Sequence, residues 1–82
     1  MKKTDHHARV PLAVLLPGSA ATVDTLDDAI DAAQCEQLIA YGLAPARPVR
    51  VMQQRPMTIV MIDEVELALE SSVARHIWVS RA

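Results

Sequence analysis

The chain has 82 residues, a formal net charge of −2 and a hydrophobic fraction of 51%. This length predicts one domain with one modest core, built from aliphatic side chains and methionine because the chain has one Tyr, one Trp and no Phe. The single cysteine excludes an internal disulfide and fits a reducing compartment, so we expect a cytoplasmic protein.

Charge is unevenly distributed along the chain. No Lys or Arg occurs between Val10 and Ala46, whereas Arg47, Arg50 and Arg55 follow closely. Without interleaved aromatic residues, these arginines predict a solvated face and no nucleic-acid site. The N-terminal stretch imitates a secretory signal, but its acidic residue, two histidines and internal proline argue against that interpretation. No segment approaches the roughly 20 apolar residues of a membrane span.

The first third of the chain predicts a tail, a turn and a strand. Residues 1–9 are polar and are expected to form a flexible N-terminal tail, which leaves 10–82 as the single domain. The apolar run Leu12–Leu16 is expected to pack as a short turn over one end of the core. A Pro-Gly corner follows, and alternating small and β-branched residues then predict a strand over Ser19–Leu26.

A helix is expected next. Asp27 or Asp28 is the predicted N-cap, and Gly42 is the predicted end. Residues at helical spacing define its buried stripe, which we predict to consist of Cys35, Leu38, Ile39 and Gly42.

The second half of the chain predicts strands and a hairpin. Val49–Gln53 alternates as a strand, and Pro56 stops it. Thr58–Leu69 is the clearest hairpin, with Asp63-Glu64 as its two-residue loop. The predicted core-side pairs are Ile62 with Val65, Val60 with Leu67, and Thr58 with Leu69. Ser71–Arg75 then predicts a helical turn, and Ile77–Val79 a closing strand.

These elements predict a mainly β protein with one α-helix, folded as a small closed barrel of five strands. A barrel of this size has no room for an active-site cleft. Its function is therefore expected on the outer surface or at one end.

Several short segments carry a resemblance to a known family. They comprise a Leu-Gly-Leu-type helix exit before a Pro, a Pro after the second strand, and a Leu-x-Leu hairpin return. In this chain they are Leu38–Pro45, Pro48–Val51, Arg55–Met57, Glu66–Leu69 and Ala74–Ile77. This pattern resembles FeoA, the small SH3-like barrel partner of bacterial ferrous-iron transport. Ala46 departs from the family pattern, which usually has Gly there.

The resemblance implies a cytosolic accessory protein of ferrous iron uptake. Its implied partner is FeoB, the membrane permease whose cytosolic G-domain hydrolyses GTP. It implies no catalysis, and the residues agree, because no nucleophile-base arrangement has a usable spacing and two glycines cannot form a phosphate-binding loop.

Two surfaces are the candidate partner sites. One is the outer face of the first hairpin strand with an outward tryptophan, and its residues are Met57, Ile59, Met61 and Trp78. The other is the helix exit, with residues Leu38, Tyr41, Leu43 and Pro45. Alternatively, Leu12–Leu16 or the helix covers the first face as ordinary core, or that face mediates self-association.

Transition-metal binding, with Fe²⁺ as the implied ion, is the competing class of function. The candidate ligands are Asp5, His6, His7, Cys35 and His76. Adjacent histidines do not readily converge on one ion, and no CxxC or HExxH pattern occurs, so we expect no resident cofactor. Recognition of proline-rich peptides is not expected either, because such grooves are lined by aromatic residues that this chain lacks.

Overall fold

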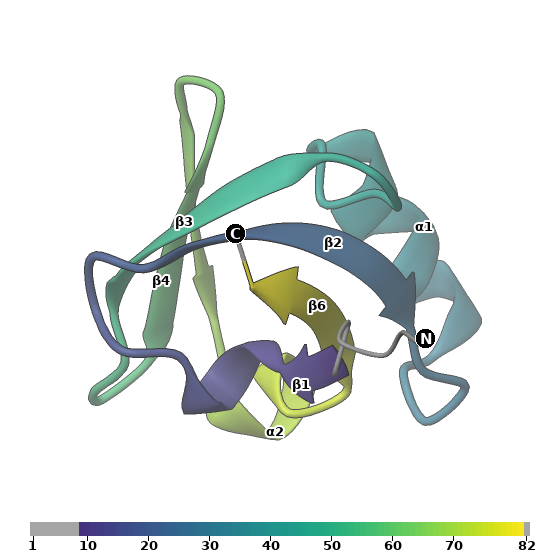
Figure 1. The fold of residues 1–82 in the computed structure, drawn as a ribbon. Helices are drawn as coiled ribbons and strands as arrows, with labels where there is room; N and C mark the ends of the chain where they lie inside the picture. Colours follow the sequence, from purple (N-terminus) through teal and green to yellow (C-terminus); the bar gives the residue numbers. More distant parts are fainter. Residues whose placement is uncertain (1–8, 82) are drawn as a thin grey trace, which may run out of the picture.

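The computed structural model describes residues 9–81, and the sheet dominates it (Figure 1). In chain order the elements are β1 (Arg9–Pro11), the 3-10 helix η1 (Leu12–Val14), β2 (Ala20–Leu26), α1 (Ala32–Ala40), β3 (Pro48–Gln53), β4 (Thr58–Ile62), β5 (Val65–Leu69), α2 (Ser71–Ala74) and β6 (Ile77–Arg81). No helix in this part of the chain is long and apolar enough to cross a membrane.

The strands form an antiparallel sheet in the order β1-β6-β2-β3-β4-β5. The prediction of a mainly β fold with one principal helix is confirmed, but the prediction of a closed five-stranded barrel is wrong. Residues 9–81 contain six strands, because Arg9, which we had placed in the tail, begins β1 opposite Ser80. The sheet is open because its two edge strands, β1 and β5, are not hydrogen-bonded to each other.

The β4–β5 hairpin has the predicted register. Ile62 lies opposite Val65, and the pairing continues to Thr58 opposite Leu69. Asp63 has φ 55°, as the first central residue of a type II′ turn requires. Val65 is 42% exposed, because it lies at the hairpin tip beyond the core, so its predicted core position is wrong.

The core is aliphatic, as the composition predicts. Its largest fully enclosed apolar side chains come from η1, the strands and the loop after α1, and they are Leu12, Val23, Leu43, Val51, Val60, Ile62, Ile77 and Val79. Thr58 is the one buried polar residue recorded in the described part of the chain. The core therefore depends on shape and on very few polar contacts.

Gln54 fastens η1 to the end of the sheet. Its Nε2 donates to the carbonyl oxygens of Leu12 at 3.0 Å and Leu15 at 2.7 Å, and its Oε1 accepts from Thr58 Oγ1 at 2.6 Å. Leu12 and Leu15 are buried, which confirms that this segment packs over one end of the core. Gln54 thus supplies the recorded partner of the Leu15 carbonyl and of the Thr58 hydroxyl, and a second donor to the Leu12 carbonyl, which also accepts from the Leu15 N–H at 3.3 Å.

Helix α1 begins later than predicted. Its N-cap is Asp31, whose carboxylate accepts from the Gln34 N–H at 3.3 Å, so the prediction of Asp27 or Asp28 is wrong. Asp27 instead closes a turn with the Ala29 N–H at 3.0 Å.

The buried side of α1 is narrower than the predicted stripe. Leu38 is buried and Cys35 half-buried, but Ile39 is 43% exposed and its predicted core position is wrong. Gly42 ends the helix as predicted, with φ 106°, and a Cβ there would lie 3.1 Å from Ile62 Cγ2.

Ala46 occupies a left-handed conformation, with φ 74°. Its N–H donates to the Val23 carbonyl at 2.8 Å, and the Val23 N–H donates to the Arg47 carbonyl at 2.9 Å. These two bonds fix the loop on β2 and keep the alanine in a conformation that favours glycine.

Replacing Gln54 by methionine keeps the side-chain length and removes all three hydrogen bonds. We expect the free energy of unfolding to fall by about 1–3 kcal/mol, because the Leu15 carbonyl and the Thr58 hydroxyl lose their partner and the Leu12 carbonyl loses one of its two donors. Urea denaturation of Gln54→Met measures this. The neighbouring Gln53→Met variant, which breaks no recorded side-chain hydrogen bond, is the control. Equal losses of stability in both variants would contradict this role of the Gln54 hydrogen bonds.

Ala46→Gly should stabilise the protein. Relief of the left-handed alanine outweighs the added freedom of glycine in the unfolded chain, for a net gain of up to about 1 kcal/mol. Thermal unfolding compares it with Ala44→Gly, where φ is negative and a loss is expected. A loss in both variants would refute this account of Ala46.

Candidate functional site

A groove separates α1 from β5, with a volume of about 430 Å³. It is lined by residues of α1, β5, α2 and the segment before β4, namely Gln34, Gln37, Leu38, Tyr41, Met57, Leu67, Ala68, Leu69, Glu70 and Val73. We call it the helix–strand groove.

The helical wall of the helix–strand groove presents one face of α1 and its C-cap. Its residues Gln34, Gln37, Leu38 and Tyr41 follow the i, i+3, i+4, i+7 spacing that places side chains on one side of a helix. Leu38 is buried and forms the floor, whereas Tyr41 is 50% exposed. This wall therefore combines an apolar floor, two amides and an accessible aromatic ring.

The opposite wall is β5 itself. Four consecutive residues, Leu67 to Glu70, line the helix–strand groove. Because side chains alternate along a strand, such a continuous lining means that the groove runs along the edge of β5, beside its main chain. Among residues 9–81, β5 is paired with β4 alone, so this edge of the sheet has no neighbouring strand.

The structure brings together three of the eight predicted partner residues. Leu38, Tyr41 and Met57 all line the helix–strand groove, although they come from the two surfaces predicted separately. Leu43 is fully buried, so its prediction as a contact residue is wrong. Pro45 is exposed in the loop before β3.

The predicted patch on β4 does not include the tryptophan. Ile59 and Met61 are half-buried on β4, and Trp78 lies on β6, with β3 and β2 between them in the sheet. Expecting Trp78 beside these residues was wrong, because the sequence does not reveal strand order.

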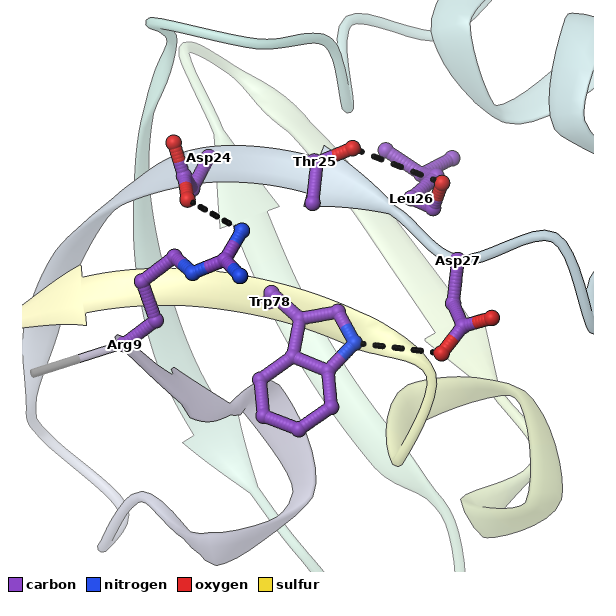
Figure 2. Close-up of polar contacts among 6 residues, drawn as sticks. All are labelled: Arg9, Asp24, Thr25, Leu26, Asp27 and Trp78. Atoms are coloured by element: carbon purple, nitrogen blue, oxygen red, sulfur yellow. Dashed lines mark hydrogen bonds and ion pairs between the residues drawn. The ribbon is translucent and has the colours of Figure 1, made fainter.

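Trp78 instead makes internal polar contacts around Asp27. Its Nε1 donates to Asp27 Oδ2 at 3.3 Å (Figure 2). The guanidinium carbon of Arg9 lies 6.0 Å from the centroid of the indole ring. Arg9 also pairs with Asp24 at 3.0 Å. Trp78 thus links β1, β2 and β6.

Asp27 accepts from several donors. In addition to Trp78, its carboxylate accepts from the Ala29 N–H and lies 3.6 Å from His76 Nδ1. The Ala29 N–H, then Trp78 and His76, hold the pKa of Asp27 below its ordinary value of 3.8, against a smaller opposing effect of burial.

The metal candidates do not converge in the described part of the chain. Within residues 9–81 no three His, Cys, Asp or Glu side chains are placed to hold an ion. Cys35 is half-buried on α1, and His76 lies beside Asp27. Asp5, His6 and His7 lie outside the described residues, so the absence of a resident cofactor stays a prediction.

A second apolar surface surrounds η1, and sequence reasoning missed it. Val14 is 54% exposed, Leu16 75% and Met52 45%, and all three line a cavity of about 700 Å³ beside Arg55 and Pro56. The sequence gives a weak signal for it, because a five-residue apolar run on a short turn cannot bury every side chain.

Comparisons with known proteins agree with this architecture. A family model described as the FeoA domain matches residues 10–81. The iron uptake regulatory protein FeoA is 22% identical over 90% of this chain and 97% of its own, with a TM-score of 0.79. FeoA of Stenotrophomonas maltophilia, solved with zinc and described as a procaryotic SH3 domain protein, is 23% identical over 84% of this chain and 87% of its own, with a TM-score of 0.74.

The same fold occurs within a larger protein. A manganese-dependent transcriptional repressor is 25% identical over 98% of this chain, with a TM-score of 0.83, but the match spans 45% of the repressor. No curated protein sequence matches. These neighbours support an SH3-like fold.

Removing the Asp27 carboxylate should change how stability depends on pH. Because the pKa is lowered in the folded state, ionised Asp27 stabilises the fold above its unfolded pKa, and this contribution disappears as pH falls through the folded pKa. Asp27→Ala should therefore be less stable than wild type at neutral pH, with a difference that shrinks below pH 3.8. Urea unfolding across pH measures it, with Asp28→Ala, which removes no recorded polar contact, as the control; the same pH dependence in both variants would contradict this role of Asp27.

Proposed function

The chain belongs to the FeoA family, which is linked to ferrous iron transport, and from this we propose that it is a non-catalytic accessory protein that binds and modulates a FeoB-type permease. Its binding partner in this proposal is the cytosolic G-domain of the permease. The protein would then act in the cytoplasm and reach the membrane through that partner.

The observation that supports a binding role is the helix–strand groove. It is apolar at its floor, polar on its helical wall and bordered by the half-exposed ring of Tyr41, a combination typical of protein interfaces. Met57 contributes a flexible side chain that adapts to a bound surface. We propose Tyr41 and Met57 as contact residues, with Leu38 as the floor beneath them.

Self-association is the alternative that a specific observation favours. Val14, Leu16 and Met52 form an exposed apolar surface around η1, distinct from the helix–strand groove. Exposed apolar patches of this kind mark interfaces between proteins. A second copy of the chain is therefore the competing partner. Sedimentation analysis that compares the oligomeric state of wild type with that of Leu16→Asp tests self-association without the permease.

Isothermal titration of the protein into the purified permease G-domain tests the main proposal. Saturable binding, measured with GDP and with a non-hydrolysable GTP analogue, is the expected result, and dependence on the nucleotide would indicate a regulatory role. No binding in either state would refute the proposal.

A matched pair of variants on α1 tests the contact surface. Tyr41→Asp places a charge at the mouth of the helix–strand groove and should weaken G-domain binding at least about tenfold, as loss of an interface aromatic does. Ile39→Asp alters a residue of similar exposure that does not line the groove, and should bind like wild type. Equal affinities would remove Tyr41 from the contact surface.

A further inference from the structure

The register of the hairpin determines which main-chain groups of β5 are unpaired. In a hairpin with a two-residue loop, the residues flanking the loop form a hydrogen-bonded pair, and hydrogen-bonded and non-hydrogen-bonded pairs then alternate along the ladder. Here the flanking pair is Ile62 and Val65, and Met61 pairs with Glu66 and Ile59 with Ala68. The N–H and C=O groups of Glu66 and Ala68 therefore point away from β4, on the edge where Ala68 lines the helix–strand groove.

These outward groups have no backbone partner within residues 9–81. The sheet ends at β5, and neither the turns nor the helix caps of this region hydrogen-bond to Glu66 or Ala68. Helix α1 lies across the groove and presents side chains there rather than main-chain groups. The edge can accept another strand, with α1 covering that strand on one side.

The other edge of the sheet is less suited to pairing. Strand β1 has three residues, and Pro11 lacks an N–H. Strand β5 has five residues and no proline. The two edges therefore differ, and the longer edge is the one that borders a groove.

Charge indicates what kind of strand fits. From Met57 to Ala74 the sequence contains no Lys, Arg or His, and α1 contains none either. Glu64, Glu66 and Glu70 are exposed along β5 and its ends, and form no ion pair within residues 9–81. Of these three, Glu70 lines the helix–strand groove, Glu64 and Glu66 lie beside it along the same strand edge, and no positively charged residue lines either wall.

Side chains alternate along β5, so its apolar and its acidic side chains lie on opposite faces of the sheet. Leu67 and Leu69 point to the core side, near the floor formed by Leu38, whereas Glu66 and Ala68 point to the outer side. A strand added beside β5 would have the same alternation. Its inward residues would meet apolar side chains, and its outward residues would meet carboxylates.

We propose that the free edge of β5 binds an extended segment of a partner protein in which basic and apolar residues alternate, and that this segment adds a seventh strand to the sheet. Main-chain hydrogen bonds to Glu66 and Ala68 hold the segment, and its apolar residues enter the helix–strand groove. A second copy of the chain is not the occupant, because antiparallel pairing of two β5 strands brings their glutamates together. This inference rests on the proposed binding function and specifies the partner's binding segment.

A proline substitution tests the main-chain contact without disturbing the hairpin. Ala68→Pro removes an N–H that points outward, so the β4–β5 ladder keeps its hydrogen bonds. Ala68→Val keeps the N–H and favours a strand, and is the matched control. Urea unfolding and amide NMR spectra establish that both variants remain folded.

The probe is a short capped peptide of alternating Lys and Val, titrated into each protein. We expect wild type and Ala68→Val to bind it, Ala68→Pro to bind about tenfold more weakly, and the Glu66 and Ala68 amides to become protected from exchange on binding. A matched Glu-Val peptide should not bind, and added salt should weaken the Lys-Val complex. No binding to wild type, or equal binding to both Ala68 variants, overturns the proposal.

The same variants separate this inference from the permease proposal. If the G-domain binds Ala68→Pro and Ala68→Val equally well, the permease remains the partner and strand addition is refuted. If the G-domain binds no variant while the Lys-Val peptide binds as expected, the β5 edge remains a binding site and the permease is removed as its partner.

Discussion

The open sheet is the constraint on which the rest of the structure depends. Closing a barrel removes every strand edge, whereas this sheet ends at β1 on one side and at β5 on the other. The core between them must therefore be enclosed by other elements. Segment η1 covers one end of it, and Leu38 and Leu43, from α1 and the loop that follows, pack into it. The two surfaces with exposed apolar side chains lie beside these covering elements, because neither η1 nor α1 buries all of its apolar residues.

Two polar residues hold the covering elements in place. Gln54 joins the carbonyls of η1 to β4, and Asp27 joins the end of β2 to β6 and to the turn before α1. Each uses one side chain to satisfy several groups from different segments. An aliphatic core supplies most of the burial but specifies geometry loosely, so directional contacts of this kind fix where its covers sit.

Membership of the FeoA family and the presence of the helix–strand groove are both compatible with the proposed binding role. The FeoA family is linked to iron transport, and the surface offers a groove suited to binding another chain. The exposed glutamates in and beside β5, namely Glu64, Glu66 and Glu70, are compatible with a binding role. In the proposed strand addition, the same charges would oppose pairing between copies of the protein and attract a basic segment.

The sequence by itself determined the local elements. The β4–β5 hairpin, its two-residue loop and its register were predictable because alternation and turn residues act between neighbours in the chain. The end of α1 at Gly42 was predictable for the same reason. The N-cap at Asp31 was not, because Asp27, Asp28 and Asp31 are equally suitable caps, and contacts with Ala29 and Trp78 hold Asp27 elsewhere.

Only the tertiary structure decided which strands are neighbours and which apolar residues remain accessible. Trp78 was predicted beside Met61, but the order of strands places it near Asp27, 51 residues earlier in the chain. The groove that unites Tyr41 with Met57 likewise depends on how α1 lies against β5. Long-range packing sets both results, and periodicity, which reports which face of an element is apolar, carries no information about what that face meets.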